Sequence, residues 1–202
     1  ALLDDEKGGR FEISPHFNDM KTKQLYLPDT CVLLTRFLSA EGVGEITDFM
    51  PVEALFSGKE LIRRVTTVRG EVRYHMKCRP RFNYGKSKHY AEAVSSNEVI
   101  LTSNGEDKTV LRLKSSVPLV IKDGDVEASF ILAAGQTADF LLEHVDATHN
   151  GGRDFHTFIT DSLFQTVNYW KNWVAQSTYK GRWSDIVTRS ALVLKMLTSY
   201  NN

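Results

Sequence analysis

The clearest alternation of hydrophobic and polar residues in this chain lies between residues 71 and 82. Apolar side chains occupy alternate positions there, and charged or histidine side chains stand between them. The apolar positions are Val72, Tyr74, Met76, Cys78 and Phe82. A period of two predicts a β-strand with one buried face. Pro80 interrupts the apolar series and predicts a bulge or a sheet edge near the end of this strand.

Further apolar runs predict more strands before the helical part of the chain. They lie at 31–38, 44–50, 61–68, 98–102, 109–113, 126–133 and 138–144. Turn residues separate the runs, and Asn104-Gly105 predicts a two-residue hairpin turn because both residues tolerate positive φ. Strands spaced by about 8–15 residues, without helical patterns between them, predict an antiparallel β-sandwich rather than a parallel α/β sheet.

The period of the pattern then changes from two to three and four. Apolar residues recur at these spacings from Phe155 to Val174, which predicts an amphipathic helix. Asp154 is the predicted N-cap, because its carboxylate can accept hydrogen bonds from amides of the first turn. After a break at 179–181, a second helix is predicted with Ser184 as its cap. Its apolar stripe consists of Ile186, Val187, Ala191, Leu194 and Leu197.

The pattern divides the chain into a β-sandwich at 1–148 and a helical segment at 149–202. The apolar stripe of the second helix has two explanations: it packs on the sheet, or it forms the first wall of a further helical domain. We expect the second, because the sequence stops with no polar tail. We therefore expect this chain to be one piece of a longer protein.

The composition excludes several classes of partner. The chain has 202 residues, of which 42% are hydrophobic and 25% charged, as in an ordinary globular protein. Its 25 Lys and Arg residues balance its 25 Asp and Glu residues, so no net charge draws it toward nucleic acid or an anionic membrane. Spanning segments, signal peptides, phosphate-binding loops and dinucleotide fingerprints are absent from the sequence. We expect no nucleic acid, membrane or cofactor.

The cysteines favour an intracellular setting. Cys31 and Cys78 both lie in apolar runs, and we expect two buried thiols rather than a disulfide bridge. The sequence contains no Asn-x-Ser/Thr glycosylation acceptor. Both features indicate a reducing compartment, and we expect the protein to be cytoplasmic.

Two clusters of titratable residues are weak candidates for chemistry. The carboxylates at 4–6 are best explained as a solvated loop. The second cluster consists of His144, Asp146, His149 and His156. Its spacing does not force the side chains to converge on one ion, so we expect no metal site. The sequence has no nucleophile elbow either, and we expect no catalytic residue in this chain.

Aromatic residues gather in the helical part of the sequence. They are Tyr169, Trp170, Trp173, Tyr179 and Trp183. Aromatic rings with polar neighbours are typical of ligand pockets, and sugar rings stack on them. Trp170 falls on the helix stripe, and we expect it to pack against the sandwich. Packing also explains Trp173 and Trp183 most simply, but both are kept as candidate contacts to a substrate or a neighbouring domain.

A polar and aromatic patch follows the best-defined strand. It consists of Arg79, Arg81, Asn83 and Tyr84, within RPRFNYG at 79–85. A solvated strand end explains the patch, and so does a contact with a sugar or a neighbouring domain. Arg81 and Tyr84 are therefore the other two candidate contact residues.

Seven segments in series resemble bacterial-type glucoamylases and trehalase-like proteins of glycoside hydrolase family 15, the first four their N-terminal domain and the last three the entry into their helical domain. They are LPDTCVL at 27–33, ITDFMP at 46–51, IRRV at 62–65, RFNYG at 81–85, WKNW at 170–173, YKGRW at 179–183 and RSALVLK at 189–195. The match extends over nearly the whole chain. The chain departs from the family pattern at Cys31, where Asn is expected, and at Asn83, where Asp is expected.

The resemblance implies a β-sandwich that packs against an (α/α)6 barrel. It also implies a parent enzyme that hydrolyses terminal α-glucosidic bonds with inversion. Such an enzyme needs a general acid and a general base about 6.5–9.5 Å apart, with a water between them. In this family the barrel supplies both as glutamates, and the last helix here resembles the first barrel helix. No catalytic residue therefore carries over to this chain, which meets an oligosaccharide substrate only through the barrel.

These observations leave three functional hypotheses. In the first, the chain is the N-terminal portion of such a hydrolase, braces the catalytic barrel and is inactive alone. In the second, it is a free-standing binding module for a carbohydrate or another small ligand. In the third, it is a truncated relative with a structural or partner-binding role. The sequence does not choose between trehalose, maltose and larger glucans, because the discriminating pocket belongs to the barrel.

Overall fold

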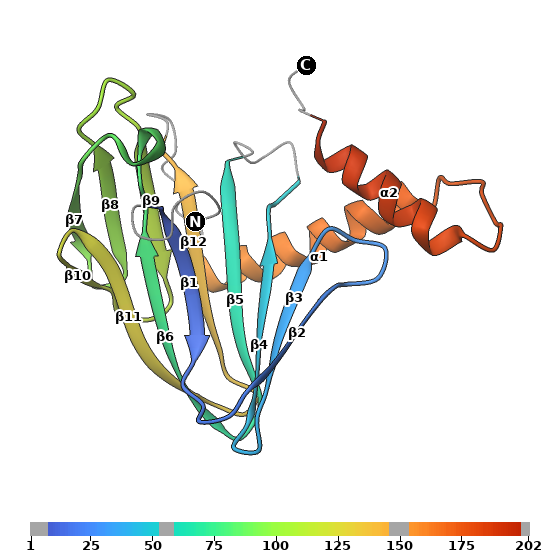
Figure 1. Cartoon of the computed structure of the whole chain (residues 1–202), viewed down its shortest axis with the longest axis horizontal. Coiled ribbons are helices and arrows are strands. Elements are labelled where there is room, and N and C mark those ends of the chain that lie inside the picture. The colour runs from blue at the N-terminus through green and yellow to red at the C-terminus, as the bar shows by residue number, and fades with distance from the viewer. Residues whose placement is uncertain (1–7, 53–58, 146–153, 199–202) are drawn as a thin grey trace.

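The computed structural model of this protein describes residues 8–52, 59–145 and 154–198. These residues form two antiparallel β-sheets stacked face to face, with two helices after the last strand (Figure 1). The predicted antiparallel β-sandwich with two C-terminal helices is therefore confirmed. The predicted boundary between 1–148 and 149–202 lies outside the described residues and stays a prediction.

The smaller sheet has four strands and the larger has eight. In sheet order, the smaller sheet consists of β1 (Arg10–Pro15), β6 (Glu71–Arg79), β11 (Asp125–Ala133) and β10 (Val120–Lys122). The larger sheet consists of β2 (Lys21–Tyr26), β3 (Leu33–Leu38), β4 (Val43–Phe49), β5 (Glu60–Arg69), β12 (Thr137–His144), β9 (Val110–Ser115), β8 (Glu98–Ser103) and β7 (His89–Ser95). Every pair of neighbouring strands is antiparallel.

Strand β6 shows the alternation that the sequence predicts. Its even-numbered residues from Val72 to Cys78 are buried between the sheets. The prediction of a sheet edge or bulge near Pro80 is wrong, because β6 pairs with β1 on one side and β11 on the other. Pro80 follows the last strand residue, Arg79, where its missing amide interrupts no ladder hydrogen bond.

The main hydrophobic core fills the space between the two sheets. Tyr74 of β6 is fully buried and stacks on Phe130 of β11, with ring centroids 5.5 Å apart. The Tyr74 hydroxyl lies 3.0 Å from Thr67 Oγ1, so this polar group keeps a partner inside the core. Gly44 on β4 makes room for the hydroxyl, since a Cβ atom at residue 44 would lie 2.3 Å from it.

The connection between β8 and β9 differs from the prediction. The predicted two-residue hairpin at Asn104-Gly105 is wrong, because β8 ends at Ser103 and β9 begins only at Val110. Within the longer loop, the Ser103 hydroxyl donates to the Asp107 carboxylate at 2.7 Å. The positive φ that closes the loop falls on Lys108.

The strands that the sequence analysis missed are the edges of the two sheets. They are β1 and β10 in the smaller sheet and β2 and β7 in the larger one. Every residue of β2 is exposed, and so are most residues of β7. The exposed strands β2 and β7 have no strong alternation of apolar residues, and β10 has only three residues. Strand β1 does bury Ile13 and Pro15, but its apolar series is short.

Both predicted helices are present. Helix α1 (Phe155–Val174) begins as predicted, because the Asp154 carboxylate accepts a hydrogen bond from the Thr157 amide at 2.9 Å. Helix α2 (Ser184–Met196) does not use Ser184 as its cap. Ser184 is the first helical residue, and its amide donates instead to the Gly181 carbonyl at 3.1 Å in the preceding turn. Within the described ranges, neither helix is long and apolar enough to cross a membrane.

Candidate functional site

Helix α1 lies on the outer face of the larger sheet, held by a second hydrophobic cluster. Ile159 of α1 is fully buried there with Ile62 of β5 and Leu141 of β12. Trp170, about three turns further along α1, is only 4% exposed. Trp170 is therefore buried, and the expectation that it packs against the sandwich stays a prediction. This burial fixes the path of the chain from the sandwich to α2.

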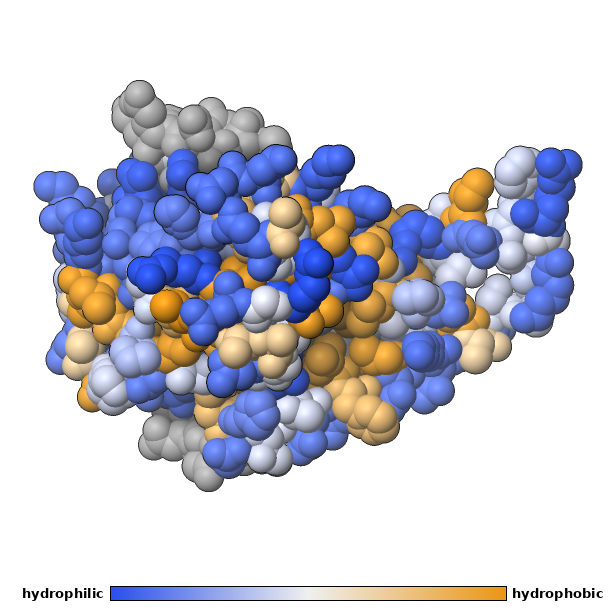
Figure 2. All heavy atoms as spheres, turned by 90° about the horizontal axis from the view of Figure 1, so that it is seen from below, coloured by the Kyte–Doolittle hydropathy of each residue, from blue (hydrophilic) through white to orange (hydrophobic). Residues whose placement is uncertain are grey.

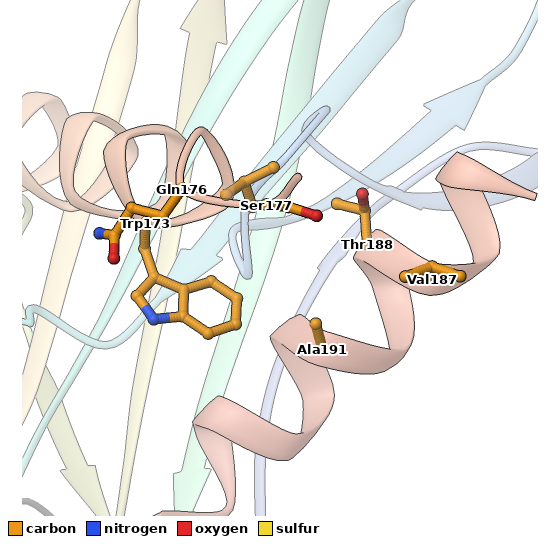
Figure 3. A pocket seen from close by; sticks show the side chains of 7 residues that line it. Trp173, Gln176, Ser177, Val187, Thr188 and Ala191 are labelled. Atoms are coloured by element: carbon orange, nitrogen blue, oxygen red, sulfur yellow. The ribbon is translucent and has the colours of Figure 1, made fainter. Parts of the chain in front are cut away.

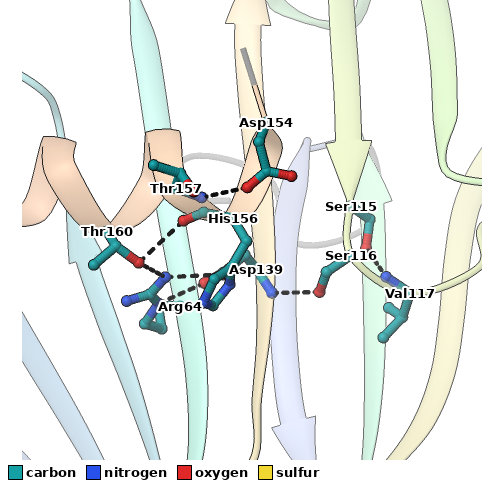
Figure 4. A network of polar contacts seen from close by, with 9 residues as sticks. All are labelled: Arg64, Ser115, Ser116, Val117, Asp139, Asp154, His156, Thr157 and Thr160. Carbon is teal, nitrogen blue, oxygen red and sulfur yellow. Dashed lines mark hydrogen bonds and ion pairs between the residues drawn. The ribbon is translucent and has the colours of Figure 1, made fainter.

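A buried ion pair lies where α1 begins (Figure 4). The Asp139 side chain on β12 is 1% exposed and accepts two hydrogen bonds from Arg64 on β5, at 2.6 and 3.0 Å. Arg64 also donates to the Thr160 hydroxyl of α1 at 3.0 Å, and His156 Nδ1 lies 3.3 Å from Asp139. A buried carboxylate requires such partners because it has lost its water. The network fixes the position of α1 on strands β5 and β12.

Helix α2 is attached to the loop between β2 and β3. Leu192 is its one fully buried residue among those described. Arg189 donates to the Thr30 carbonyl at 3.0 Å, and its guanidinium lies 4.3 Å from the centre of the Tyr26 ring. The Cys31 thiol lies 3.8 Å from the Leu192 carbonyl. Tyr26, Thr30 and Cys31 therefore form the surface that holds α2, which we call the seat of α2.

The loop that holds α2 is a turn closed by hydrogen bonds of the Thr30 side chain. The Thr30 side chain is fully buried, donates to the Leu27 carbonyl at 2.9 Å and accepts from the Val32 amide at 3.1 Å. Asp29 adopts a φ of 59°, a conformation that Asp tolerates better than most residues. A turn closed on both sides by one threonine gives α2 a defined place to dock.

The apolar stripe predicted on α2 is mostly exposed. Ile186, Leu194 and Leu197 are 61%, 67% and 79% exposed. The buried residue Leu192 lies outside this stripe. The stripe therefore does not pack on the sheet, and α2 presents an uncovered apolar face of the kind that marks interaction surfaces.

A notch of about 250 Å³ separates the end of α1 from α2 (Figure 3). The Trp173 ring points into it, facing Val187 and Ala191 of α2. Gln176, Ser177 and Thr188 add hydrogen-bonding groups to its wall. The notch has the aromatic and polar lining of a small-ligand site, but it is also open enough to receive a side chain from another part of a protein.

The four candidate contact residues do not form one site. Trp173 lines the notch, whereas Trp183 is 53% exposed in the turn before α2, with the Arg182 guanidinium 4.6 Å from its ring centre. Arg81 and Tyr84 follow β6, which lies in the sandwich well away from α2 (Figure 1). Their role as substrate or domain contacts stays a prediction.

Arg81 and Tyr84 have different surroundings although they are close in sequence. Arg81 donates to the Asp125 carboxylate at 2.9 Å and to the Pro80 carbonyl at 2.6 Å. Arg79 approaches the same carboxylate at 3.6 Å. Tyr84, in contrast, is 97% exposed. Arg81 is therefore occupied within the sandwich, and Tyr84 is the residue of this pair that can meet another molecule.

The histidine cluster gives no metal site among the described residues. His156 lies beside Asp139 in the network under α1. His149 and Asp146 lie outside the described ranges, as do the carboxylates at 4–6.

The two thiols are free, but they differ in burial. Cys78 is 1% exposed in the core, and burial raises the pKa of its thiol to about 12. Cys31 was expected to be buried and is half-buried at the seat of α2. Burial raises the pKa of the Cys31 thiol, although the nearby Arg189 lowers it. Neither thiol is poised as a nucleophile, because thiolate formation is disfavoured.

Several residues that organise this surface were not identified from the sequence. Arg64 and Asp139 face each other on paired strands, and Arg189 and Leu192 meet the loop at Thr30. Each contact joins residues far apart in the chain. The motifs LPDTCVL and RSALVLK, far apart in the sequence, are thus in contact in the structure.

The described residues define a class of protein: an antiparallel β-sandwich with one helix across its larger sheet and a second helix that presents an apolar face. Comparison with known families gives the particular assignment. A family model described as "Trehalase-like, N-terminal" matches residues 1–147. The chain belongs to this trehalase-like N-terminal domain family, as the motifs in its sequence indicated.

Its relatives are longer proteins. The chain is 30% identical over 206 residues to a trehalase of Thermoplasma acidophilum, and 29% identical over 205 residues to a trehalase of Thermoplasma volcanium. A trehalase of Mycobacterium tuberculosis is 24% identical over 226 residues. Each alignment covers 98% of this chain but only 34%, 31% and 32% of the respective relative. The chain thus spans about a third of the length of these trehalases.

Proposed function

We propose that this chain is the N-terminal portion of a trehalase- or glucoamylase-like glycoside hydrolase. In this proposal it braces the catalytic domain and has no hydrolytic activity alone. The observation that carries the proposal is the length relation: the chain aligns almost completely with trehalases, yet spans about a third of them. The rest of such a protein supplies the catalytic acid and base.

The apolar face of α2 supports a bracing role. Ile186, Leu194 and Leu197 offer a row of exposed side chains, and a second helix covers such a row by packing its own side chains between them. An (α/α)6 barrel is built from helices of this kind. We infer that α2 is the first helix of the barrel and that α1 is the linker to it.

The carboxylates of the sandwich are unsuited to glycoside hydrolysis. Inversion requires an acid and a base about 6.5–9.5 Å apart that face a substrate-sized space. Asp139, Glu143 and Asp125 are buried and accept hydrogen bonds from arginines of the sandwich. None of these three lines the notch beside Trp173. This distribution supports a noncatalytic role for the chain.

Activity measurements test the proposal. We expect the purified 202-residue chain to release no glucose from trehalose or maltose, and the complete gene product to release glucose from at least one of them. Early proton NMR spectra of the reaction of the complete product should show β-glucose from the attacked unit, as inversion at an α-glucosidic bond requires. With trehalose an equal amount of α-glucose should appear, because the leaving glucose keeps its configuration. Glucose release by the 202-residue chain itself would contradict the proposal.

A cytoplasmic location forms part of the proposal. Its support is the pair of free thiols, Cys31 and Cys78, in a protein with no glycosylation acceptor. Fractionation of native cells, followed by detection of the protein, tests it. Recovery from the medium or the periplasm would contradict it.

The notch beside Trp173 favours a second candidate function, a carbohydrate-binding module. Its aromatic ring and polar rim match the chemistry of a sugar site. Titration calorimetry with maltooligosaccharides tests this candidate, with Trp173→Ala as the variant at the notch and Trp183→Ala as the variant on the neighbouring turn. Absence of heat with the unmodified chain would remove it.

A further inference from the structure

The turn after β6 presents one aromatic side chain to solvent on an unusual backbone. Asn83, Tyr84 and Gly85 have φ values of 47°, 57° and 81°. Residues with a Cβ atom rarely adopt positive φ, and two in succession persist only where their surroundings hold them. Tyr84 is nevertheless 97% exposed, so the contacts that hold the turn come from its neighbours.

The neighbours of Tyr84 are firmly anchored. Phe82 is 6% exposed and its ring lies 5.5 Å from that of His89. The Gly85 amide donates to the Phe82 carbonyl at 2.9 Å, and the Lys86 amide donates to the Asn83 carbonyl at 3.1 Å. We call residues 82–86 the Tyr84 turn.

A second turn is joined to the base of the Tyr84 turn. His89 Nε2 lies 2.9 Å from the Gly124 carbonyl, and Arg81 donates to Asp125 at 2.9 Å. Asp123 and Gly124 also have positive φ, of 52° and 80°. The two turns therefore fix each other, and Tyr84 projects from a rigid base.

The Tyr84 turn lies at the end of the sandwich toward which α2 runs. Figure 1 shows the end of β6, the ends of β8 and β12 and the C-terminal end of α2 on the same side of the molecule. The seat of α2, in the loop between β2 and β3, is also at this end. Chain that continues from α2 therefore starts on the same side of the molecule as the end of the sandwich that carries Tyr84.

We propose that the Tyr84 turn is a docking contact for the polypeptide that follows α2, with Tyr84 as its anchor. The inference rests on the proposed function, which places a catalytic domain after α2. Tyrosine is enriched among residues that dominate interface energies, because it buries a large amphipathic ring and loses little rotamer freedom. A rigid base reduces the entropy lost on docking further.

A photo-crosslinking experiment on the complete gene product tests the contact. p-Benzoylphenylalanine replaces Tyr84, and in a matched control it replaces Val68, which is 51% exposed at the opposite end of the sandwich. We expect residue 84 to crosslink to peptides beyond residue 202, and residue 68 not to. Failure at residue 84, or equal crosslinking from residue 68, would overturn the inference.

A pair of substitutions tests the anchoring role. Tyr84→Ala should leave the thermal midpoint of the 202-residue chain unchanged but lower that of the complete gene product, and Tyr84→Phe should restore most of the loss. An equal loss in both proteins would assign Tyr84 to the sandwich alone and overturn the inference. If the complete product is active but Tyr84→Ala changes neither protein, the inference fails and the proposed function stands. If the gene product ends at residue 202, the proposed function fails first.

Discussion

Arg64 and Asp139 illustrate how much of this structure depends on single residues. Asp139 is almost fully buried, and its charge is balanced by a two-fold hydrogen bond from Arg64. The sequence did not predict this pair, because the residues lie 75 positions apart and neither stands out in the pattern. The alternation in β6 was predictable, since it depends only on which neighbours along one strand are apolar.

Asp139→Asn should lower the free energy of unfolding by about 3 kcal/mol, because it leaves the charge of Arg64, 13% exposed, without its counterion. Glu127→Gln serves as the control, since Glu127 pairs with Lys77 at 2.9 Å on the more exposed face of the smaller sheet. We expect this control to lose less than about 1 kcal/mol. Urea unfolding of both variants makes the comparison. If both variants lost the same free energy of unfolding, burial of the Arg64–Asp139 pair would not increase its contribution to stability.

At the scale of elements, the sequence predicted what depends on local pattern. The interior strands and both helices were visible in their periods, and the four edge strands were not, because these strands are exposed or have only a short apolar series. The seat of α2 was also not predictable, since Cys31 and Leu192 meet across 161 residues of chain. Trp173 and Tyr84 were selected from the sequence, and the structure places Trp173 at a notch and leaves Tyr84 exposed. Their surroundings could not be predicted, because they are formed by residues that are distant in the sequence.

The attachment of α2 should depend on Leu192 and not on Leu194. Leu192→Ala removes a fully buried side chain and should destabilise the docked helix by about 2–5 kcal/mol. Leu194→Ala, on the same helix but 67% exposed, is the matched control and should have little effect in the 202-residue chain. Amide hydrogen exchange of α2 reports the difference. Faster exchange in both variants to the same degree would rule out the seat described here.

The start of α1 should be sensitive to acid. The hydrogen bond from the Thr157 amide holds the pKa of Asp154 below its usual 3.8. Because the folded-state pKa is the lower one, the cap contributes fully above pH 3.8 and is lost as the pH falls through that lower value. The protection factor of the Thr157 amide, which compares its exchange rate with the intrinsic rate at the same pH, should therefore fall at acid pH.

Asp154→Asn is the control for this prediction. The substituted side chain retains an acceptor but has no carboxyl to protonate, so protection of Thr157 should no longer change over this pH range. An identical acid response in the Asp154→Asn variant would assign it to another group.

At the scale of the whole molecule, the sandwich and α1 bury apolar side chains in two clusters, whereas α2 leaves most of its apolar stripe exposed. The sandwich has its own core, and α1 closes a second cluster on its outer face. Figure 2 shows hydrophobic side chains at the surface between the sandwich and the projecting end of the molecule. The exposed apolar face of α2, together with relatives about three times as long, supports the central proposal that this chain is one part of a larger hydrolase.

The mass of the intact protein from native cells tests this claim most directly. Mass spectrometry of the polypeptide that contains these residues should give about three times the 22.9 kDa of this chain, as the 34% coverage of its relative implies. Peptides from the 202 residues and from the longer remainder should belong to that one species. An intact polypeptide of 22.9 kDa would contradict the account.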